Sequence, residues 1–382
     1  MSSEQPPGAP ATVIHRSRRR PQIGVDRGWG WRSGGTIRAV SSELHPGLDR
    51  VASARLGVFT AAEARAAGYT ADEIRSALRS GRWTALRRGI YIETGRWVQA
   101  RSDPRTRHLV TSVAVLAAIG SDAVLSHESA ARFHELVLPA PTAPHIEDVV
   151  RLTDPQQWRT GSGYRIARAS LPEGDVVRMP EFSVTTVART LVDCSRDWFL
   201  VDAVVAMDAA IFGRLTTRTE LTAAVLAARH WVGIGGAGRA LGLADGRAES
   251  PLETRTRLGF VFAGMPAPEP QVEIWDGGVL LGRVDGWFED AAVVVESDGK
   301  VKYSDPRNGR TAAEVLMKEK AREDAMRERG IRFLRVVDAD VRRFDRVVVP
   351  RVERLLSQPF TGPRRFRTVR TQEPGTPPAR AA

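Results

Sequence analysis

The residues of this chain best suited to chemistry lie in one short stretch near its C-terminus. All four lysines, among 56 basic residues in 382, fall here: Lys300, Lys302, Lys318 and Lys320. The stretch follows directly after Glu296-Ser-Asp298. Lysine is a compact point charge with a tunable pKa, whereas arginine is planar and permanently charged. Lysines beside carboxylates at a strand end predict a site that handles a phosphate or a water, although a solvated helix could also carry them.

Nearby carboxylates could hold a metal ion. A turn centred on Glu289-Asp290 would set Asp285 opposite Val294 and make Glu296 its diagonal neighbour on the same face, about 7–8 Å away. Asp298 would lie two residues further along that face. Carboxylates at this spacing can bridge Mg²⁺ or Mn²⁺, which binds substrate phosphate and activates an attacking water. A hairpin that carries ordinary exposed acids is the alternative.

The lysines would complete such a site. Lys300 or Lys302, directly after the metal-binding strand, could orient the water or neutralise the charge that develops on phosphorus. Of the two lysines on the next helix only one is expected to face the site, and Lys320 is the preferred candidate.

The elements that must position these residues begin near residue 249. Ser250, Pro251 and Glu253 combine an N-cap, a first-turn proline and a capping-box glutamate, and so predict a helix start. Alternation and turn residues then predict strands over 271–275, 279–288 and 291–296, a helix over 311–329, a strand over 331–337 and a helix over 341–356. The predicted order is αβββαβ followed by a helix.

This region resembles the PD-(D/E)XK nuclease fold, and most closely its branch similar to very-short-patch-repair endonucleases. The resemblance rests on Asp285, on Glu296-Ser-Asp298-Gly299-Lys300 and on the run from Lys320 to Arg335, and it covers roughly residues 248–358. It implies a restriction-endonuclease-like αβββαβ domain whose metal is held by Glu253, Asp285 and Glu296. Asp298 occupies the E-x-K lysine position, so the lysine role would pass to Lys300, Lys302 or Lys320.

The sequence between residues 50 and 95 predicts a winged helix-turn-helix. Thr60 with Glu63, and Thr70 with Glu73, form capping boxes that open two short helices. Residues 83–92 then predict two strands around a tight turn. Five arginines on the second helix and the wing would meet a major groove and its phosphates: Arg75, Arg79, Arg82, Arg87 and Arg88. A small protein-interaction module is the alternative.

Three segments resemble the AbiEi-type antitoxins of abortive-infection toxin–antitoxin systems. They are Phe59-Thr-Ala-Ala-Glu-Ala, Gly81-Arg-Trp83-Thr-Ala-Leu-Arg-Arg-Gly89-Ile-Tyr91 and Ser126-His127-Glu-Ser-Ala-Ala. The resemblance is strongest over residues 50–95 and weaker to about residue 240. It implies a winged helix that binds double-stranded DNA, often for autoregulation, and a middle region that contacts a partner such as a cognate toxin.

Other features of the middle region predict structure rather than chemistry. Cys194 lies in an apolar helix and is expected in the core. His127 and His134 lie seven residues apart and lack further ligands at metal-binding spacing, so they are expected to be structural. The segment 233–238 matches G-x-G-x-x-G but follows a helix, so it predicts a loop between helices and no nucleotide cofactor.

The fold class is therefore expected to be a multidomain α+β and α/β protein. The expected segments are a disordered basic tail (1–48), the winged helix-turn-helix (49–100), a mixed α/β middle region (101–245), the nuclease-like domain (246–358) and a second disordered basic tail (359–382). Much of the net charge of +11 lies in the two tails. The single cysteine fits a cytoplasmic protein, and no apolar run is long enough for a membrane span.

Two functions remain open from the sequence. The first is a Mg²⁺-dependent endodeoxyribonuclease that its winged helix brings to DNA, with phage defence or repair as its setting. The second is a non-catalytic, antitoxin-type transcriptional regulator whose nuclease fold is degenerate. Retention of Asp285, Glu296 and Asp298 favours the enzyme, whereas the missing E-x-K lysine favours the regulator.

Overall fold

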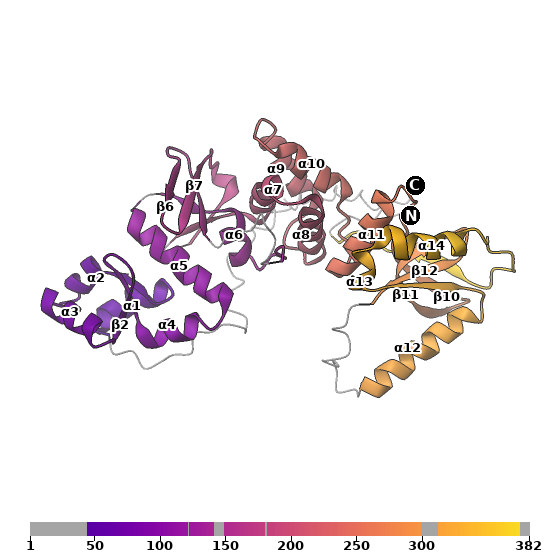
Figure 1. The fold of residues 1–382 in the computed structure, drawn as a ribbon, viewed down its shortest axis with the longest axis horizontal. Coiled ribbons are helices and arrows are strands. Elements are labelled where there is room, and N and C mark those ends of the chain that lie inside the picture. Colours follow the sequence, from indigo (N-terminus) through magenta and orange to yellow (C-terminus); the bar gives the residue numbers. More distant parts are fainter. Residues whose placement is uncertain (1–43, 121, 141–148, 180–181, 299–311, 375–382) are drawn as a thin grey trace, which may run out of the picture.

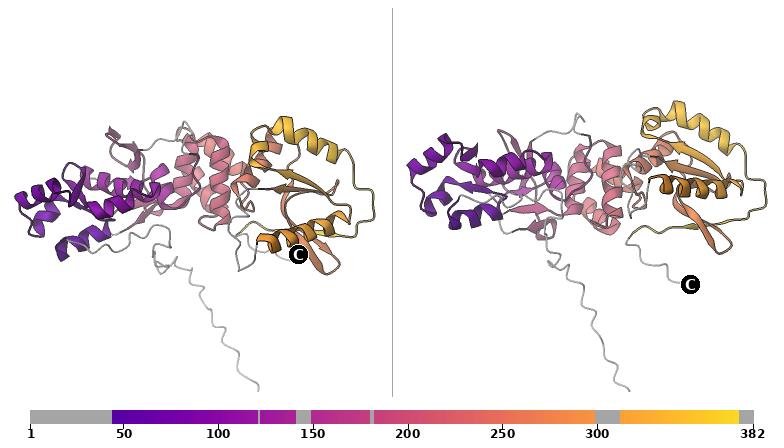
Figure 2. Two further views of the ribbon diagram at one scale, coloured as in Figure 1. Left: turned by 60° about the horizontal axis from the view of Figure 1, so that its bottom comes forward. Right: turned by 90° about the horizontal axis from the view of Figure 1, so that it is seen from below.

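A computed structural model describes residues 44–120, 122–140, 149–179, 182–298 and 312–374. It shows a mixed α/β multidomain protein whose parts follow one another along the long axis of the molecule (Figure 1). The same succession is visible from two other directions (Figure 2). Most of the expected N-terminal tail, Lys300 and Lys302 lie outside the described residues.

The N-terminal part is a winged helix. Its elements are α1 (Pro46–Ala54), β1 (Val58–Thr60), α2 (Ala61–Ala66), α3 (Ala71–Arg79), β2 (Trp83–Arg87), β3 (Ile90–Glu93) and α4 (Thr94–Ala100). The antiparallel sheet has the order β1-β3-β2. Both predicted capping boxes form at the starts of α2 and α3. After these helices the chain turns at Gly68 and Gly81, whose φ angles of 99° and 73° favour glycine.

The middle region begins with the long helix α5 (Pro104–Ile119), followed by a six-stranded sheet. Its further elements are β4 (Val124–Leu125), α6 (His127–Phe133), β5 (Val150–Asp154), β6 (Arg159–Gly161), β7 (Tyr164–Arg168), η1 (Glu173–Asp175), β8 (Val176–Arg178) and β9 (Ser183–Thr185). The strand order is β6-β7-β5-β4-β9-β8. Val113 of α5 packs with the winged helix, whereas Val115 packs with the six-stranded sheet, so α5 joins the two cores.

A helical layer follows the six-stranded sheet. It consists of α7 (Val187–Asp197), α8 (Leu200–Phe212), α9 (Arg218–Ala227) and α10 (Ile234–Leu243). The loop expected at 233–238 is mostly helix, because α10 begins directly after Gly233. A Cβ atom on Gly236 would lie 3.2 Å from the Ser195 carbonyl oxygen, so this glycine lets α10 approach α7. Cys194 is fully buried in this layer, as predicted.

The C-terminal domain has the predicted αβββαβ order. Its elements are α11 (Pro251–Phe262), β10 (Glu269–Asp276), β11 (Val279–Phe288), β12 (Val293–Ser297), α12 (Ala312–Arg327), β13 (Arg332–Val336), α13 (Asp338–Val341), α14 (Phe344–Leu356) and β14 (Arg367–Arg370). The strand order is β13-β12-β11-β10-β14. Phe260 and Val348 from α11 and α14 pack on one face of the sheet, whereas Met326 from α12 packs on the other. Figure 1 shows these helices on opposite sides of the sheet.

Two features of this sheet differ from expectation. Val294 lies opposite Trp287 rather than Asp285, because four residues with Ala292 at a φ of 47° separate the strands. Residues 367–370, expected within a disordered tail, form β14 against β10. The buried ring of Phe366, which packs against Trp287, anchors this segment to the core. Two phenylalanines, Phe360 and Phe366, within a basic, proline-containing sequence are a weak signal for an edge strand.

A buried ion pair joins the middle region to the C-terminal domain. Asp208 of α8 is 1% exposed and accepts hydrogen bonds from Arg257 (2.9 Å) and Thr254 (2.8 Å), both in α11. The backbone amide of Asp245 donates a third hydrogen bond to Asp208, at 2.6 Å. Glu373, just after β14, pairs with Arg218 of α9 at 3.0 Å and adds a second connection.

Within the described residues, no helix is both long enough and apolar enough to cross a membrane.

Candidate nucleic-acid interface and acidic pocket

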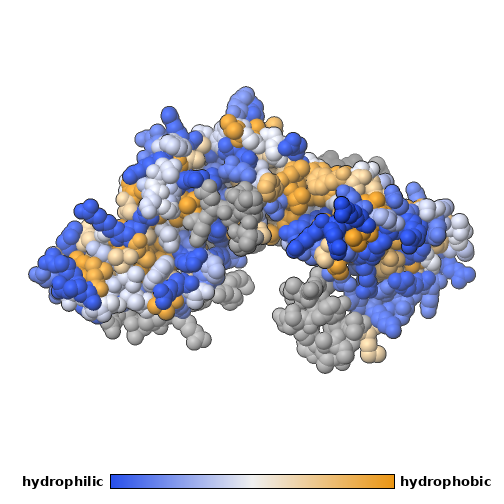
Figure 3. Space-filling view, in the orientation of Figure 1, coloured by the Kyte–Doolittle hydropathy of each residue, from blue (hydrophilic) through white to orange (hydrophobic). Residues whose placement is uncertain are grey.

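Helix α3 presents a basic outer face. Its inner residues Ile74 and Ala77 are buried in the core of the winged helix, and this directs Arg75 and Arg79 outward. Arg75 pairs with Asp72 one turn earlier, but both side chains are more than half exposed, so this pair holds the arginine only weakly. The outer end of the winged helix, where α3 lies, is largely hydrophilic in Figure 3.

The two predicted DNA-binding arginines of the wing, Arg87 and Arg88, have different surroundings. Arg88 at the turn between β2 and β3 is exposed, as is Arg82 just before β2. Arg87 instead donates a hydrogen bond of 2.7 Å to the carbonyl oxygen of Ser162, and its guanidinium lies 5.4 Å from the centre of the Tyr164 ring. The predicted DNA-contacting position of Arg87 is therefore used to join the wing to the middle region.

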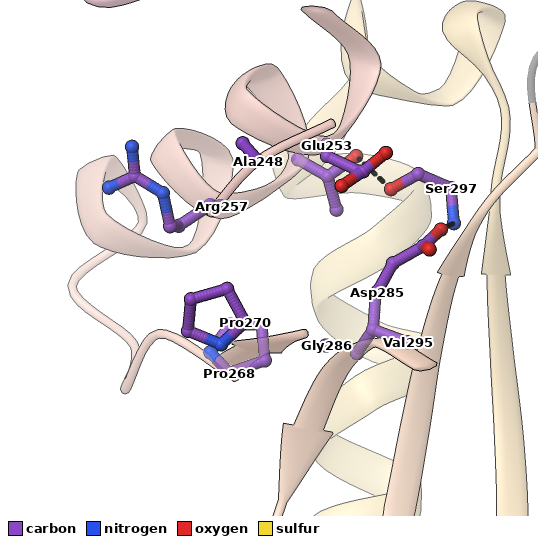
Figure 4. A pocket seen from close by; sticks show the side chains of 10 residues that line it. Ala248, Glu253, Arg257, Pro268, Pro270, Asp285, Gly286, Val295 and Ser297 are labelled. Carbon is purple, nitrogen blue, oxygen red and sulfur yellow. Dashed lines mark hydrogen bonds between the residues drawn. The ribbon is translucent and has the colours of Figure 1, made fainter. Parts of the chain in front are cut away.

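The C-terminal domain has a small pocket between α11 and the sheet (Figure 4). Glu253, Asp285 and Ser297 line it, together with Ala248, Thr256, Arg257, Pro268, Pro270, Gly286 and Val295. Glu253 accepts hydrogen bonds from the Ser250 hydroxyl (2.8 Å), the Glu249 amide (2.9 Å) and the Gln271 side chain (2.9 Å). Asp285 accepts one from the Ser297 amide, at 2.8 Å. Two of the three predicted metal ligands thus border one pocket.

Glu296, the third predicted ligand, does not line this pocket. Side chains alternate along a strand, and Val295 and Ser297 on either side of it do line the pocket. Glu296 pairs with Arg322 of α12 at 3.0 Å. The same-face placement of Asp285 and Glu296 expected from the sequence is therefore wrong.

Asp298 and Lys320 are likewise separate from the pocket lining. Asp298 pairs with Arg335 of β13 at 3.3 Å, and Lys320 is exposed on α12. Among the described residues, no group of three or more His, Cys, Asp or Glu side chains could hold a metal ion. As placed, these acids accept hydrogen bonds or ion pairs from groups of the chain itself. The magnesium ion stays a prediction.

The two histidines of the middle region have structural surroundings. The His127 ring shares a hydrogen bond of 2.9 Å with the Ser126 hydroxyl, and burial together with nearby arginines holds the pKa of His127 well below its usual range. His134 bonds to the Thr185 carbonyl oxygen at 2.6 Å, and burial lowers its pKa as well. Ser126 is the N-cap residue of α6, although its side chain makes no hydrogen bond to the first turn of that helix. Both histidines are therefore neutral, buried groups with hydrogen-bond partners.

Part of the chain has relatives among mycobacterial proteins. Two relatives from Mycobacterium tuberculosis match it, the uncharacterized protein Rv2248 of strain ATCC 25618 / H37Rv and the uncharacterized protein MT2308 of strain CDC 1551 / Oshkosh. Each is 32% identical over 174 residues, which are 46% of this chain. The chain spans 62% of the length of these relatives.

A family match covers the winged helix. Residues 48–94, from within α1 to the end of β3, match the family described as "Transcriptional regulator, AbiEi antitoxin". The chain therefore carries an AbiEi antitoxin-type transcriptional-regulator domain at residues 48–94.

Proposed function

We propose that this protein is a DNA-binding regulator of the antitoxin type. Helix α3 would enter the major groove of double-stranded DNA, and the wing would lie on the adjacent phosphates. The observation that carries the proposal is the charge of this surface, because residues 74–92 contain five arginines and no acidic residue. The antitoxin-type domain also supports a cognate toxin as a protein partner.

A double variant of α3 and the wing tests this proposal. Replacing Arg79 and Arg88 together by alanine is expected to lower affinity for duplex DNA roughly 10- to 100-fold, because each arginine makes a charge-assisted contact. Counterion release predicts that the slope of log affinity against log salt falls by about 2. Fluorescence anisotropy with a labelled duplex, over a salt series, measures both quantities.

The matched control is Arg229→Ala with Arg239→Ala. Both control residues are exposed on the α9–α10 side of the middle region. This control removes the same two charges, so it separates a local contact from a general effect of net charge. Equal affinities of the Arg79/Arg88 variant and the wild type would remove the winged helix from the proposed function.

The αβββαβ order and the Glu253–Asp285 pocket support a second candidate function, a Mg²⁺-dependent endonuclease. This candidate requires Glu296 to exchange Arg322 for a metal ion. Wild-type protein in Mg²⁺ or Mn²⁺ is expected to nick supercoiled plasmid DNA, and Asp285→Ala is expected to abolish nicking. Asp290→Ala, an exposed acid in the neighbouring turn, is the control. Intact plasmid in the wild-type reaction would reject this candidate and leave the regulator unaffected.

A further inference from the structure

The hairpin of β6 and β7 lies against the wing of the winged helix. The contact is made by Arg87, which bonds to Ser162 in the turn of this hairpin and lies over Tyr164 of β7. Strand β6 is the edge strand of the six-stranded sheet. Figure 1 shows β6 and β7 at the part of the middle region near the winged helix. The two hairpins, β2–β3 and β6–β7, are therefore neighbours in space although about 75 residues separate them in sequence.

Both hairpins are strongly basic. Residues 155–172 contain Arg159, Arg165 and Arg168 and no acidic residue, which matches the acid-free segment 74–92 of the winged helix. The guanidinium of Arg159 lies 5.8 Å from the centre of the same Tyr164 ring that Arg87 approaches to 5.4 Å. Two guanidinium groups therefore lie near one aromatic ring, and a bound anion nearby would interact favourably with both charges.

The hairpin also presents a large aromatic side chain. Trp158, directly before β6, is 74% exposed. The loop that carries it is held in place, because the buried carboxylate of Asp154 accepts hydrogen bonds from the Gln156 amide (2.8 Å) and the Gln157 side chain (2.9 Å). Tryptophan is enriched at interfaces, because its ring is apolar and its indole N–H can donate a hydrogen bond.

We propose that the β6–β7 hairpin is a second wing, which binds the phosphodiester backbone of double-stranded DNA beside the wing of the winged helix. Arg159 and Arg165 belong to neighbouring pairs of the register and so lie on opposite faces of the hairpin. The hairpin therefore meets the duplex edge-on, each arginine contacts a phosphate on its own side, and Trp158 packs against a sugar. The proposal rests on the proposed DNA-binding function and extends its footprint beyond α3 and the first wing. Arg87 sets the spacing between the two hairpins.

Duplex length provides the test. A duplex of about 12 base pairs, a little more than one helical turn, is long enough for α3 and the first wing, whereas one of about 30 base pairs also reaches the hairpin. Arg159→Ala with Arg165→Ala is expected to weaken binding to the longer duplex roughly tenfold and to lower its salt slope by about 2. Binding to the shorter duplex is expected to stay at the wild-type level.

Two further variants keep the result interpretable. The double variant Arg159→Lys with Arg165→Lys retains both charges, so it is expected to retain most of the affinity for the longer duplex. If substitution at these positions simply misfolded the hairpin, the lysine variant would lose affinity as well. The Arg79/Arg88 variant should bind both duplexes weakly. Wild-type affinity of the Arg159/Arg165 variant for the longer duplex would overturn the second wing and leave the regulator intact. Wild-type affinity of both alanine variants would overturn the proposed function as well.

Discussion

Replacing Arg257 by alanine is expected to lower the free energy of unfolding by about 3–5 kcal/mol at pH 8. Arg257 is the arginine that pairs with Asp208 across the junction of the middle region and the C-terminal domain. Removing one partner of a buried ion pair leaves the other charge without compensation, and this costs more than the pair itself contributes. Urea unfolding followed by tryptophan fluorescence measures the change.

A neighbouring arginine supplies the control for this variant. Arg255, two residues earlier in α11, pairs with Asp338 at 3.5 Å, and both side chains are at least one-third exposed. Exposed pairs contribute about 0–1 kcal/mol. Arg255→Ala is therefore expected to change stability by less than about 1 kcal/mol. A similar loss in both variants would show that the Asp208–Arg257 pair has no special role at the junction.

The cost of Arg257→Ala should depend on pH. Burial raises the pKa of Asp208 to about 6, against the opposing effect of Arg257, whereas an unfolded aspartate titrates near 3.9. The folded protein therefore gains stability from proton uptake as pH falls from about 6 towards 4, and loses it as pH rises through about 6. Without Arg257 the pKa of Asp208 rises further, so the variant should be less destabilised at pH 5 than at pH 8. A pH-independent difference would contradict this account.

Arg189→Ala is expected to cost a comparable 3–5 kcal/mol within the middle region. Arg189 is 3% exposed and bonds to Asp193 (3.0 Å) and Asp175 (2.9 Å), and its guanidinium lies 4.4 Å from the centre of the Trp231 ring. In the variant, buried Asp193 keeps Arg196 at 3.5 Å. The loss follows because a buried carboxylate then lacks its shorter ion pair and the stacked guanidinium is gone.

The comparison that tests this prediction is Arg189→Lys. Lysine keeps the positive charge but cannot reach both carboxylates with a planar fork, so an intermediate loss of stability is expected. Burial raises the pKa of Asp193 to about 6, so the alanine variant should again be less destabilised at pH 5 than at pH 8. Thermal unfolding of the three proteins at both pH values measures these differences. Equal stability of alanine and wild type would show that Asp193 is compensated elsewhere.

The local signals of this sequence predicted local structure well. Thr60 and Thr70, each with a glutamate three residues later, place the starts of α2 and α3, and the Ser250–Pro251 pair places the start of α11. Such signals succeed because a cap and its partner lie within one helical turn. The αβββαβ order followed for the same reason, since turn residues and alternation are also local.

The register of the strands and the partners of the side chains were harder to predict from the sequence. The two-residue error at the β11–β12 turn arose because the sequence does not show that Ala292 adopts a positive φ. A shift of two residues leaves every side chain on its own face, because only a one-residue slip exchanges the faces. Glu296 is separated from the pocket of Glu253 and Asp285 because it pairs with Arg322 of α12, which lies on the other side of the sheet. The contact of Arg87 with Ser162 could not be predicted from local signals either, because the two residues lie 75 positions apart in the sequence.

The sequence by itself determined the elements of this protein, their order and the basic character of its winged helix, because capping, alternation and charge are properties of neighbouring residues. Only the tertiary structure decided which charges meet. In the folded protein Asp208 pairs with Arg257, Glu296 pairs with Arg322, and the β6–β7 hairpin lies beside the wing. These contacts depend on packing between distant segments, and an arginine-rich chain offers each carboxylate many possible partners.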